Sequence, residues 1–215
     1  RVSALQAFWP SLLLMAGDIG AARDTFKAYW SVWRKYKSLP ELFDLSKNDV
    51  LTFAKDSPLR PELAESALHL YLKTRDAHFL VVGRELVAAL NNISRVPCGF
   101  ASIADATTHR LDDRMDSYFF AETLKYLFLL FDLSLEPADR RSFFCCDDDD
   151  DDIADDAPYS DAKGCPPAGA CVRLDRTLFS TEGHFFEVPF PEALGPFGSL
   201  KAGLEPVCDA HAGAM

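Results

Sequence analysis

The sequence lacks three features that would each indicate a particular class of protein. No run of apolar residues is long enough to span a bilayer, which takes about 20 residues as a helix. The six cysteines show none of the paired CxxC spacing of a zinc site. Basic residues are outnumbered, 22 Lys and Arg against 33 Asp and Glu, giving a net charge of −11. This balance argues against nucleic acid as a partner and is compatible with a bound cation and a neutral, sugar-like substrate.

An unbroken run of aspartates at residues 147–152 carries much of the acidic excess. It lacks the alternating ligand and turn spacing of an EF-hand loop, so a solvated charge run is preferred over a calcium site. Cys165 and Cys171 flank a loop rich in Pro and Gly and could form a disulfide in an oxidising compartment. We expect a mobile, low-complexity insertion at about 133–171 and a flexible tail at 189–215.

Helical periodicity is what the sequence contains in abundance. Its 215 residues, 48% hydrophobic and 12% aromatic, suffice for one domain with a sizeable core. Apolar spacing predicts five helices, at about 3–16, 20–37, 61–74, 77–93 and 113–132. The apolar stripe of the first is formed by Leu5, Phe8, Trp9, Leu12 and Leu13. Short connections predict that consecutive helices form antiparallel hairpins.

The helical hairpins recur about 55 residues apart, which is typical of a solenoid or a closed α/α toroid. The helix at 113–132 is apolar nearly all round its second half, which predicts burial on most sides and favours a closed barrel. Residues 38–59 are predicted as a polar loop and 94–112 as loop with a short strand. Residues 172–188 have strand-like character and predict a β-hairpin, so the expected fold is all-α with one small β element.

Two carboxylates share the first turn of the helix that Pro61 starts. Proline is favourable at a first helical position, because its missing N–H would be unpaired there anyway. Glu62 and Glu65 are spaced i and i+3, so they lie on one face, next to Arg60 and the positive end of the helix dipole. Adjacent carboxylates tolerate each other through a cation, a shared proton or water. The plain alternative is a solvated helix start.

Five motifs in this order resemble glycoside hydrolase family 47, the class I α-1,2-mannosidases. They are LQAFWP at 5–10, LPE at 39–41, LRPELAES at 59–66, RMDSYFFAETLKYL at 114–127 and FSTEGH at 179–184. The segment VPCGF at 96–100 and the glycine of TEGH resemble the branch of ER degradation-enhancing α-mannosidase-like proteins. The resemblance covers roughly residues 3–132 and 177–188.

The resemblance implies a fold, a reaction and a location. The family fold is an (α/α)7 barrel plugged by a C-terminal β-hairpin, and residues 1–188 would be its C-terminal portion, interrupted by the acidic insertion. The family removes terminal α-1,2-linked mannose from Man9-type N-glycans with inversion and uses calcium. The implied partners are then high-mannose N-glycans on glycoproteins. An oxidoreductase is a further partner that the resemblance leaves open. The implied location is the endoplasmic reticulum.

The resemblance also assigns roles to acidic residues. Glu62, in Arg-Pro-Glu, is the expected general base that activates water, since inversion needs one carboxylate for water and another for the leaving oxygen. Glu41, in Leu-Pro-Glu, matches a second acidic position of the active site, with a loop carboxylate as the alternative. Arg60 is expected to contact sugar hydroxyls or to orient a carboxylate. Phe119 is expected to offer a ring to a sugar, with core packing as an equal alternative.

Thr181 matches the threonine at the hairpin tip whose oxygens bind calcium in the family. Calcium takes roughly six to eight oxygen ligands, several of them waters. Glu62, Glu65, Glu122 and Glu182 are expected to hold those waters, because a divalent cation lets several carboxylates share one cavity. The alternative for Glu122 is an ion pair with the lysine three residues later.

Two departures from the family pattern bear on activity. The family often has a catalytic aspartate at the position of Ser3, and a serine cannot act as a carboxylate. The chain begins at Arg1 with no visible signal peptide, so we expect a fragment that lacks the upstream acid and is inactive alone. One hypothesis is an ER α-1,2-mannosidase that trims glycans of misfolded glycoproteins. The alternative is a catalytically weak, lectin-like mannose receptor, which Ser3 favours. A third is a truncated product that does not fold.

Overall fold

A computed structural model describes residues 1–135, 177–179 and 181–187. They fall into two units, Arg1–Leu130 with Thr181–Gly183, and the described parts of Phe131–Ser180 and His184–Met215. The predicted acidic insertion from residue 136 onward, the division at residue 188, the tail and the Cys165–Cys171 pair lie outside the described residues. Within the described residues, no helix combines the length and hydropathy needed to cross a membrane.

The first unit consists mainly of helices. They are η1 (Ala4–Phe8), α1 (Trp9–Met15), α2 (Ile19–Tyr36), α3 (Glu62–Thr74), α4 (His78–Ala89), η2 (Leu90–Ser94), η3 (Phe119–Leu124) and α5 (Lys125–Asp132). η1 is a 3-10 helix, whereas η2 and η3 have the wider i→i+5 π-helical turn. The five predicted helices are confirmed as segments, but the fifth begins at Phe119 rather than near residue 113.

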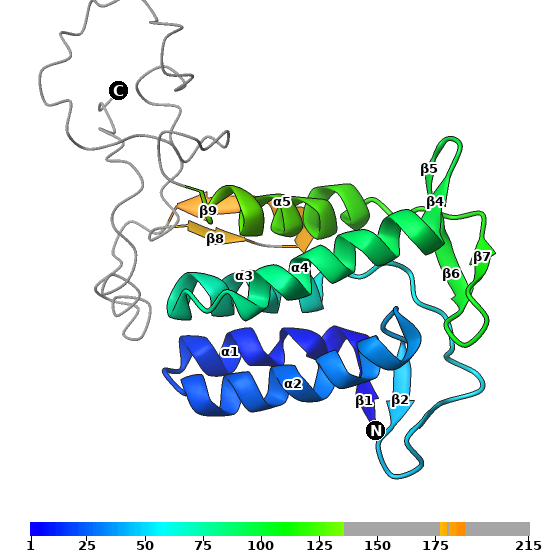
Figure 1. The fold of residues 1–215 in the computed structure, drawn as a ribbon, viewed down its shortest axis with the longest axis horizontal. Coiled ribbons are helices and arrows are strands. Elements are labelled where there is room, and N and C mark those ends of the chain that lie inside the picture. The colour runs from blue at the N-terminus through cyan, green and yellow to red at the C-terminus, as the bar shows by residue number, and fades with distance from the viewer. Residues whose placement is uncertain (136–176, 180, 188–215) are drawn as a thin grey trace, which may run out of the picture. The chain divides into compact units, whose positions relative to one another are not determined.

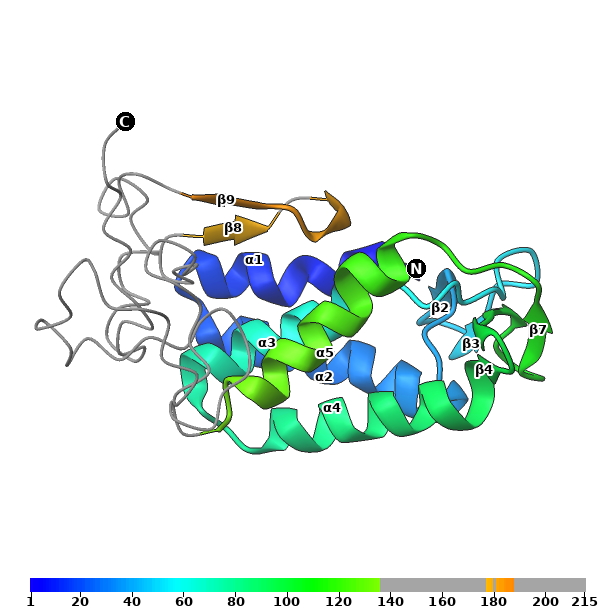
Figure 2. The ribbon, with the colours of Figure 1, turned by 90° about the horizontal axis from the view of Figure 1, so that it is seen from above.

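α3 occupies the centre of this helical arrangement. α1 and α2 form one antiparallel hairpin, and α3 and α4 form the next (Figure 1). α3 also packs against η1, α1, α2 and η3, so it has neighbours on several sides (Figure 2). The first turn of α3, which carries the two predicted carboxylates, is therefore held inside the unit.

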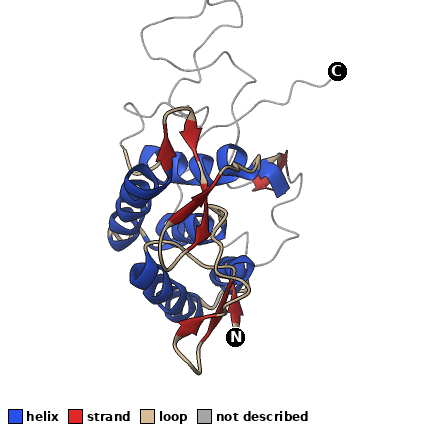
Figure 3. Cartoon of the chain, turned by 90° about the vertical axis from the view of Figure 1, so that its right-hand side faces the viewer, coloured by secondary structure: helices blue, strands red, loops and turns tan. Residues whose placement is uncertain are grey.

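Short antiparallel strands gather at one end of the helices (Figure 3). A three-stranded sheet has the order β1-β2-β3, formed by Val2–Ser3, Leu42–Asp44 and Asp49–Val50. Two further pairs join β4 (Arg95–Val96) to β5 (Gly99–Phe100) and β6 (Ser102–Asp105) to β7 (Arg110–Asp112). The segments predicted as loops, 38–59 and 94–112, thus contain more strand than expected.

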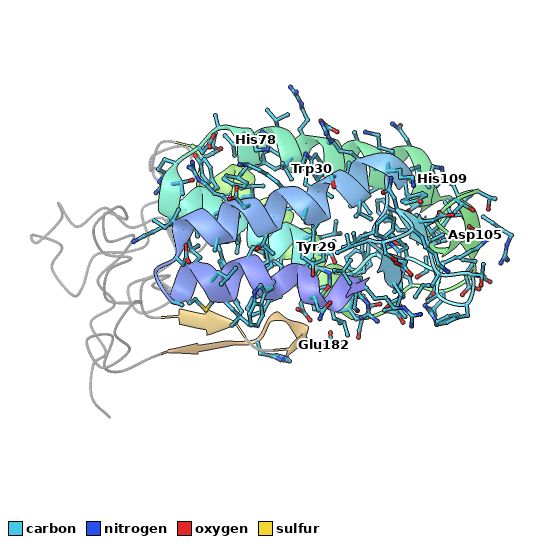
Figure 4. The ribbon with its side chains drawn as sticks, turned by 90° about the horizontal axis from the view of Figure 1, so that it is seen from below. Tyr29, Trp30, His78, Asp105, His109 and Glu182 are labelled. Atoms are coloured by element: carbon cyan, nitrogen blue, oxygen red, sulfur yellow. The ribbon has the colours of Figure 1, made fainter. Side chains whose placement is uncertain are left out.

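The long helix α2 supplies much of the aromatic core. Phe26 packs edge-on against Phe79 of α4, with ring centroids 5.3 Å apart. Trp30 and Trp33 stack at 4.5 Å along the buried face of α2, next to the buried Tyr29 (Figure 4). The helix begins at Asp18, whose carboxylate accepts the Ala21 N–H, so an otherwise unpaired donor is capped.

The predicted apolar stripe of the first helix is wrong. Leu5 and Trp9 are each 53% exposed, and Leu12 is 42% exposed. The buried positions are instead small or compact residues, namely Ala4, Ala7, Pro10, Ser11 and Leu14. Helices that pack closely place small side chains at the contact, so residue size and not hydrophobicity selected the inner face.

The predicted all-round burial of the fifth helix holds only in part. Tyr126, Leu127, Leu129 and Leu130 are buried, but Phe128 is 50% exposed. Fewer sides of α5 are therefore buried than its apolar sequence predicts. The closed barrel stays a prediction.

A buried chain of hydroxyl groups joins α1 to α3. Ser66 Oγ donates to the Ala7 carbonyl oxygen at 2.6 Å and lies 3.1 Å from Ser11 Oγ. Ser11 Oγ in turn lies 2.9 Å from His69 Nδ1. Because Ser11 and Ser66 are fully buried, these bonds fix the rotation of α3 against α1.

His69 is expected to make stability fall in mild acid. Burial lowers the pKa of its ring from 6.5 to about 4. Between these values the unfolded chain binds a proton that the folded protein does not, so stability decreases as pH falls from 6.5 towards 4. The loss is about 3 kcal/mol if fully realised. Denaturant unfolding at pH 7 and pH 5 should show a shallower pH dependence for His69→Gln than for the wild type.

The matched control is His78→Gln, which removes an exposed histidine at the start of α4. An identical pH dependence in the wild type and His69→Gln would contradict the assignment.

The second unit contains a β-hairpin. β8 (Thr177–Phe179) pairs antiparallel with β9 (Phe185–Glu187), with Phe179 opposite Phe185. The hairpin predicted at 172–188 is therefore confirmed over its described residues. Its tip, η6 (Thr181–Gly183), belongs to the first unit, and its role as a barrel plug stays a prediction.

Candidate functional site

The backbone just before α3 is held in an unfavourable conformation. Leu59 has a φ of 60°, in the left-handed region that costs a residue with a side chain about 1–2 kcal/mol. The Thr123 hydroxyl of η3 donates to the Leu59 carbonyl oxygen at 2.7 Å, which holds this turn. Arg60 follows directly, so the turn at Leu59 sets the direction in which α3 begins. Strain of this kind is common at functional sites.

α3 then begins one residue later than expected, with Pro61 as its cap. The Pro61 carbonyl accepts the Glu65 N–H at 2.9 Å, which is the first helical hydrogen bond. Glu62 and Glu65 both lie in the first turn, as predicted. The unpaired N–H groups of this turn favour negative charge nearby.

Glu65 is the most perturbed of a group of acidic side chains. It is 9% exposed, and burial raises its pKa from 4.5 to about 8, with the charges of Glu122 and Glu62 adding to the effect. The Tyr126 hydroxyl donates to Glu65 and acts in the opposite direction. Burial also raises the pKa values of Glu62 and Glu122. Helices α3 and η3 thus bring together three of the four carboxyl groups predicted to share one cavity.

Glu62 has a carboxylate oxygen without a partner. Its Oε2 atom is buried and makes no hydrogen bond, although an unsatisfied buried oxygen costs about 1–3 kcal/mol. Arg60 lowers the pKa of Glu62, whereas Glu122 and Glu41 raise it, in addition to the larger effect of burial. The side chain is therefore positioned to accept a proton or a hydrogen bond from a small molecule, water included.

Glu41 and Arg60 form an ion pair beside Glu62. Arg60 Nε donates to Glu41 Oε1, and both side chains are largely shielded from solvent. The guanidinium also lies 5.7 Å from the ring centroid of Tyr118. Tyr118 is itself held by hydrogen bonds from its hydroxyl to Asp116 and to the Pro58 carbonyl. The predicted role of Arg60 in orienting a carboxylate agrees with its bond to Glu41.

The hairpin tip supplies the remaining predicted residues. The Glu182 N–H donates to Glu122 Oε1 at 2.7 Å, and the Glu182 carboxylate accepts the Ser117 hydroxyl at 2.7 Å. Glu182 is labelled in Figure 4. Lys125 donates to the Gly183 carbonyl, so it bonds to the tip in addition to lying near Glu122. Thr181 is the first residue of this tip.

Phe119 does not offer a ring to a sugar in this structure. It is fully buried and packs with Leu59 and Ile103, with its ring centroid 5.1 Å from that of Phe100. The core-packing alternative is therefore the one observed, and the sugar contact expected for Phe119 is wrong.

Sequence reasoning missed three residues around the carboxylates, Ser117, Tyr118 and Tyr126, and it considered Lys125 only as a partner of Glu122. All lie in or next to the π-helical turn η3, which was predicted as ordinary helix. The motif that contains them was identified in the sequence, but which of its side chains contact the carboxyl groups was not predicted.

Ser3 has a local structural role. Its hydroxyl accepts the Leu5 N–H at 3.3 Å, and its N–H donates to Gln6 Oε1 at 2.9 Å, which together form a capping box. The following residue, Ala4, donates to the Glu41 carbonyl at 3.1 Å. Ser3 therefore lies in the same corner of the structure as Glu41.

The carboxyl groups fit a cation reached through water better than one bound directly. Within the described part of the chain, no three His, Cys, Asp or Glu side chains converge closely enough to hold a metal ion by themselves. The unpaired Glu62 oxygen and the raised pKa values nevertheless indicate a deficit of positive charge among these groups. Calcium, Thr181 as its ligand and the catalytic roles of Glu62 and Glu41 stay predictions.

Comparison with known proteins agrees with the motifs. The chain is 40% identical to alpha-mannosidase I MNS4 of Arabidopsis thaliana over 86% of its own length and 25% of the relative. It is 46% identical to human ER degradation-enhancing alpha-mannosidase-like protein 2 over 60% of its length and 22% of the relative. The chain thus spans a quarter or less of the length of the curated relatives it matches.

A solved structure has a similar fold. The alpha-1,2-mannosidase from Trichoderma reesei matches with a TM-score of 0.61 at 19% identity, over 87% of this chain and 39% of that one. The family model described as Glycosyl hydrolase family 47 matches residues 1–143. The family resemblance read from the motifs is therefore confirmed, and the chain belongs to glycosyl hydrolase family 47.

Proposed function

We propose that this chain is the C-terminal part of an α-1,2-mannosidase-like protein of the endoplasmic reticulum. The full-length protein would trim Man9-type N-glycans of misfolded glycoproteins for degradation, by calcium-dependent hydrolysis with inversion. Relatives named ER degradation-enhancing alpha-mannosidase-like proteins support the location and the process. In this proposal the helices of the chain form part of an (α/α)7 barrel and the hairpin is its plug.

The single observation that carries the proposal is the unpaired, buried oxygen of Glu62 at the start of α3. An inverting glycosidase needs a carboxylate that takes a proton from water on one face of the sugar. Burial raises the pKa of Glu62, which favours uptake of a proton, and the positive charge of Arg60 partly opposes this rise. Glu62 therefore has an open acceptor and an electrostatic partner for this role.

The neighbouring residues have supporting roles in the proposal. The ion pair between Glu41 and Arg60 gives a rigid polar surface, whose remaining N–H groups can donate to sugar hydroxyls. The ring of Tyr118 beside Arg60 offers an apolar face of the kind that sugars use. Phe119 has no role in binding, because its ring is buried.

The oxygen-rich part of the site suits calcium. Thr181 would supply a ligand from the tip, and Glu62, Glu65, Glu122 and Glu182 would orient water molecules around the ion. When bound, calcium would supply positive charge that neutralises the crowded carboxyl groups and orients sugar hydroxyls. This role accounts for why three carboxyl groups with raised pKa values are kept together.

A second candidate is a lectin-like receptor that binds mannose and cleaves it weakly. It is favoured by Ser3, which caps η1 where the family often has a catalytic aspartate. Mannose release from a Man9-type glycan by the full-length protein, with calcium and with a chelator, separates the two. Calcium-dependent release with inverted product supports the enzyme, whereas calcium-dependent binding without release supports the receptor. Neither binding nor release would overturn both.

A further inference from the structure

The tip of the hairpin makes three hydrogen bonds, through its backbone and one side chain, to residues in and beside η3. Glu182 donates its N–H to Glu122 and accepts the Ser117 hydroxyl through its carboxylate, each at 2.7 Å. Lys125 donates to the Gly183 carbonyl. Ser117, Glu122 and Lys125 are named the clasp below. All three contacts join residues 58 to 65 positions apart in the sequence.

The tip has a backbone conformation that needs support. Glu182 has φ 63° and ψ 17°, and Gly183 has φ 61°, so two successive residues are left-handed. Glycine adopts this conformation at little cost, but glutamate does not. A strained residue of this kind persists only where its surroundings hold it in place. The two hydrogen bonds of Glu182 are the contacts that do so.

Close packing adds a steric requirement at Gly183. A Cβ atom built there would overlap the Ala121 carbonyl oxygen and would lie 2.6 Å from Lys125 Nζ. The tip therefore approaches the backbone of η3 more closely than any other residue type allows. The clasp and this approach together fix both the position and the direction of the tip.

One short segment around the π-helical turn provides the clasp. Ser117 and Glu122 are five residues apart, and in an α-helix this spacing places side chains on different faces. Ser117 lies just before η3 and Glu122 lies within it, and both side chains reach the same tip residue. The first residue of α5, Lys125, follows on from this turn and reaches the neighbouring carbonyl.

We propose that the clasp docks the hairpin tip in the absence of any cation, so that Ser117 and Lys125 are positioning residues for the backbone of Thr181. The use of the docked tip for calcium rests on the proposed function, whereas the docking itself does not. Pre-positioned ligands lower the cost of binding, because less freedom is lost when the ion arrives.

The test is amide hydrogen exchange at Glu182 and Gly183 in the full-length protein with a chelator present. Lys125→Met and Ser117→Ala should each reduce protection of these amides by about tenfold, the effect of losing one hydrogen bond. Lys125→Arg should retain most of the protection. Lys27→Met is the matched control, since Lys27 pairs only at the surface of α2 with Asp24. Unchanged protection in both clasp variants would overturn the proposal.

A second measurement separates docking from calcium binding. Titration with calcium, followed by calorimetry, should give about tenfold weaker affinity for Ser117→Ala and Lys125→Met. Gly183→Ala should weaken it at least as much, while Gly20→Ala, whose added Cβ meets only Asp18 Oδ1 at 3.6 Å, should not. Loss of protection with unchanged affinity would overturn the positioning role. If the wild type bound no calcium while the clasp variants lost protection, the proposed function would fail and the docking would stand.

Discussion

Replacing Glu65 by glutamine is expected to stabilise the protein by up to about 5 kcal/mol at pH 9 in the presence of a chelator, and by almost nothing at pH 4. Burial and the charges of Glu122 and Glu62 raise the pKa of Glu65 to about 8, against 4.5 for an ordinary glutamate. Between these values the folded protein holds a proton that the unfolded chain releases. Stability therefore falls as pH rises from 4.5 to 8, and glutamine removes this loss.

Denaturant unfolding of the wild type and Glu65→Gln across this pH range checks the prediction. Glutamine keeps an oxygen that can accept the Tyr126 hydroxyl, so the substitution removes the charge and little else. Glu85→Gln is the control, because Glu85 lies on α4 in a partly exposed pair with Lys37. A stability gain that is the same at pH 4 and pH 9 would show that the ionised Glu65 carboxyl is not its source.

Calcium is expected to reverse the effect of Glu65→Gln on stability, so that the substitution destabilises the protein. In the proposed site the wild type gains stability from the ion at pH 8 and above, where Glu65 is ionised. Glu65→Gln should gain less, because one of the groups that orients the ion's water has lost its charge. The same unfolding series with calcium in excess gives the comparison.

Glu62→Gln is expected to reduce kcat for mannose release by the full-length protein by a factor of about 10² to 10⁴, the usual contribution of a general base. Glutamine occupies the same volume but cannot take a proton from water. The KM should change much less, because Glu62 Oε2 has no partner in this structure and is assigned to water in the proposal. Binding of the glycan should therefore survive the substitution.

The pH profile of release gives a separate check on Glu62. Burial raises the pKa of this carboxyl group, so the acidic limb of the wild-type profile should lie at a higher pH than an ordinary glutamate would give. Glu85→Gln again serves as the control and should leave release unchanged. Release by Glu62→Gln at the wild-type rate would remove Glu62 from the reaction.

Local spacing was enough to predict the start of the site. Glu62 and Glu65 lie three residues apart after a proline. Residues with this spacing in a helix lie on the same face, so their proximity follows from the local sequence alone. The start of α2 was predicted at about residue 20 and lies at Ile19, next to the local cap that Asp18 provides. The presence of the helices therefore followed from residues within a few positions of one another.

Side-chain burial and contacts between distant segments could not be predicted, because they depend on long-range packing. The inner face of α1 was selected by close contact with other helices, so Ser11 is buried while Trp9 is exposed. The turn of η3 departs from the α-helical period, and in this segment Phe119 lies in the core and Tyr118 lies beside Arg60. The ion pair of Arg60 with Glu41 depends on how a 19-residue segment folds back, which no local pattern specifies.

The hydroxyl bridge between Ser11 and Ser66 has a consequence for the rate at which the site assembles. Single helices form within about a microsecond, but this bridge joins residues 55 positions apart, and the bond from Thr123 to Leu59 spans 64 positions. We infer that the carboxyl groups come together late in folding, after the helices that carry them. Interactions formed after the folding barrier slow unfolding and leave the folding rate nearly unchanged. A ligand of this site would therefore lengthen the lifetime of the folded protein without helping it to fold.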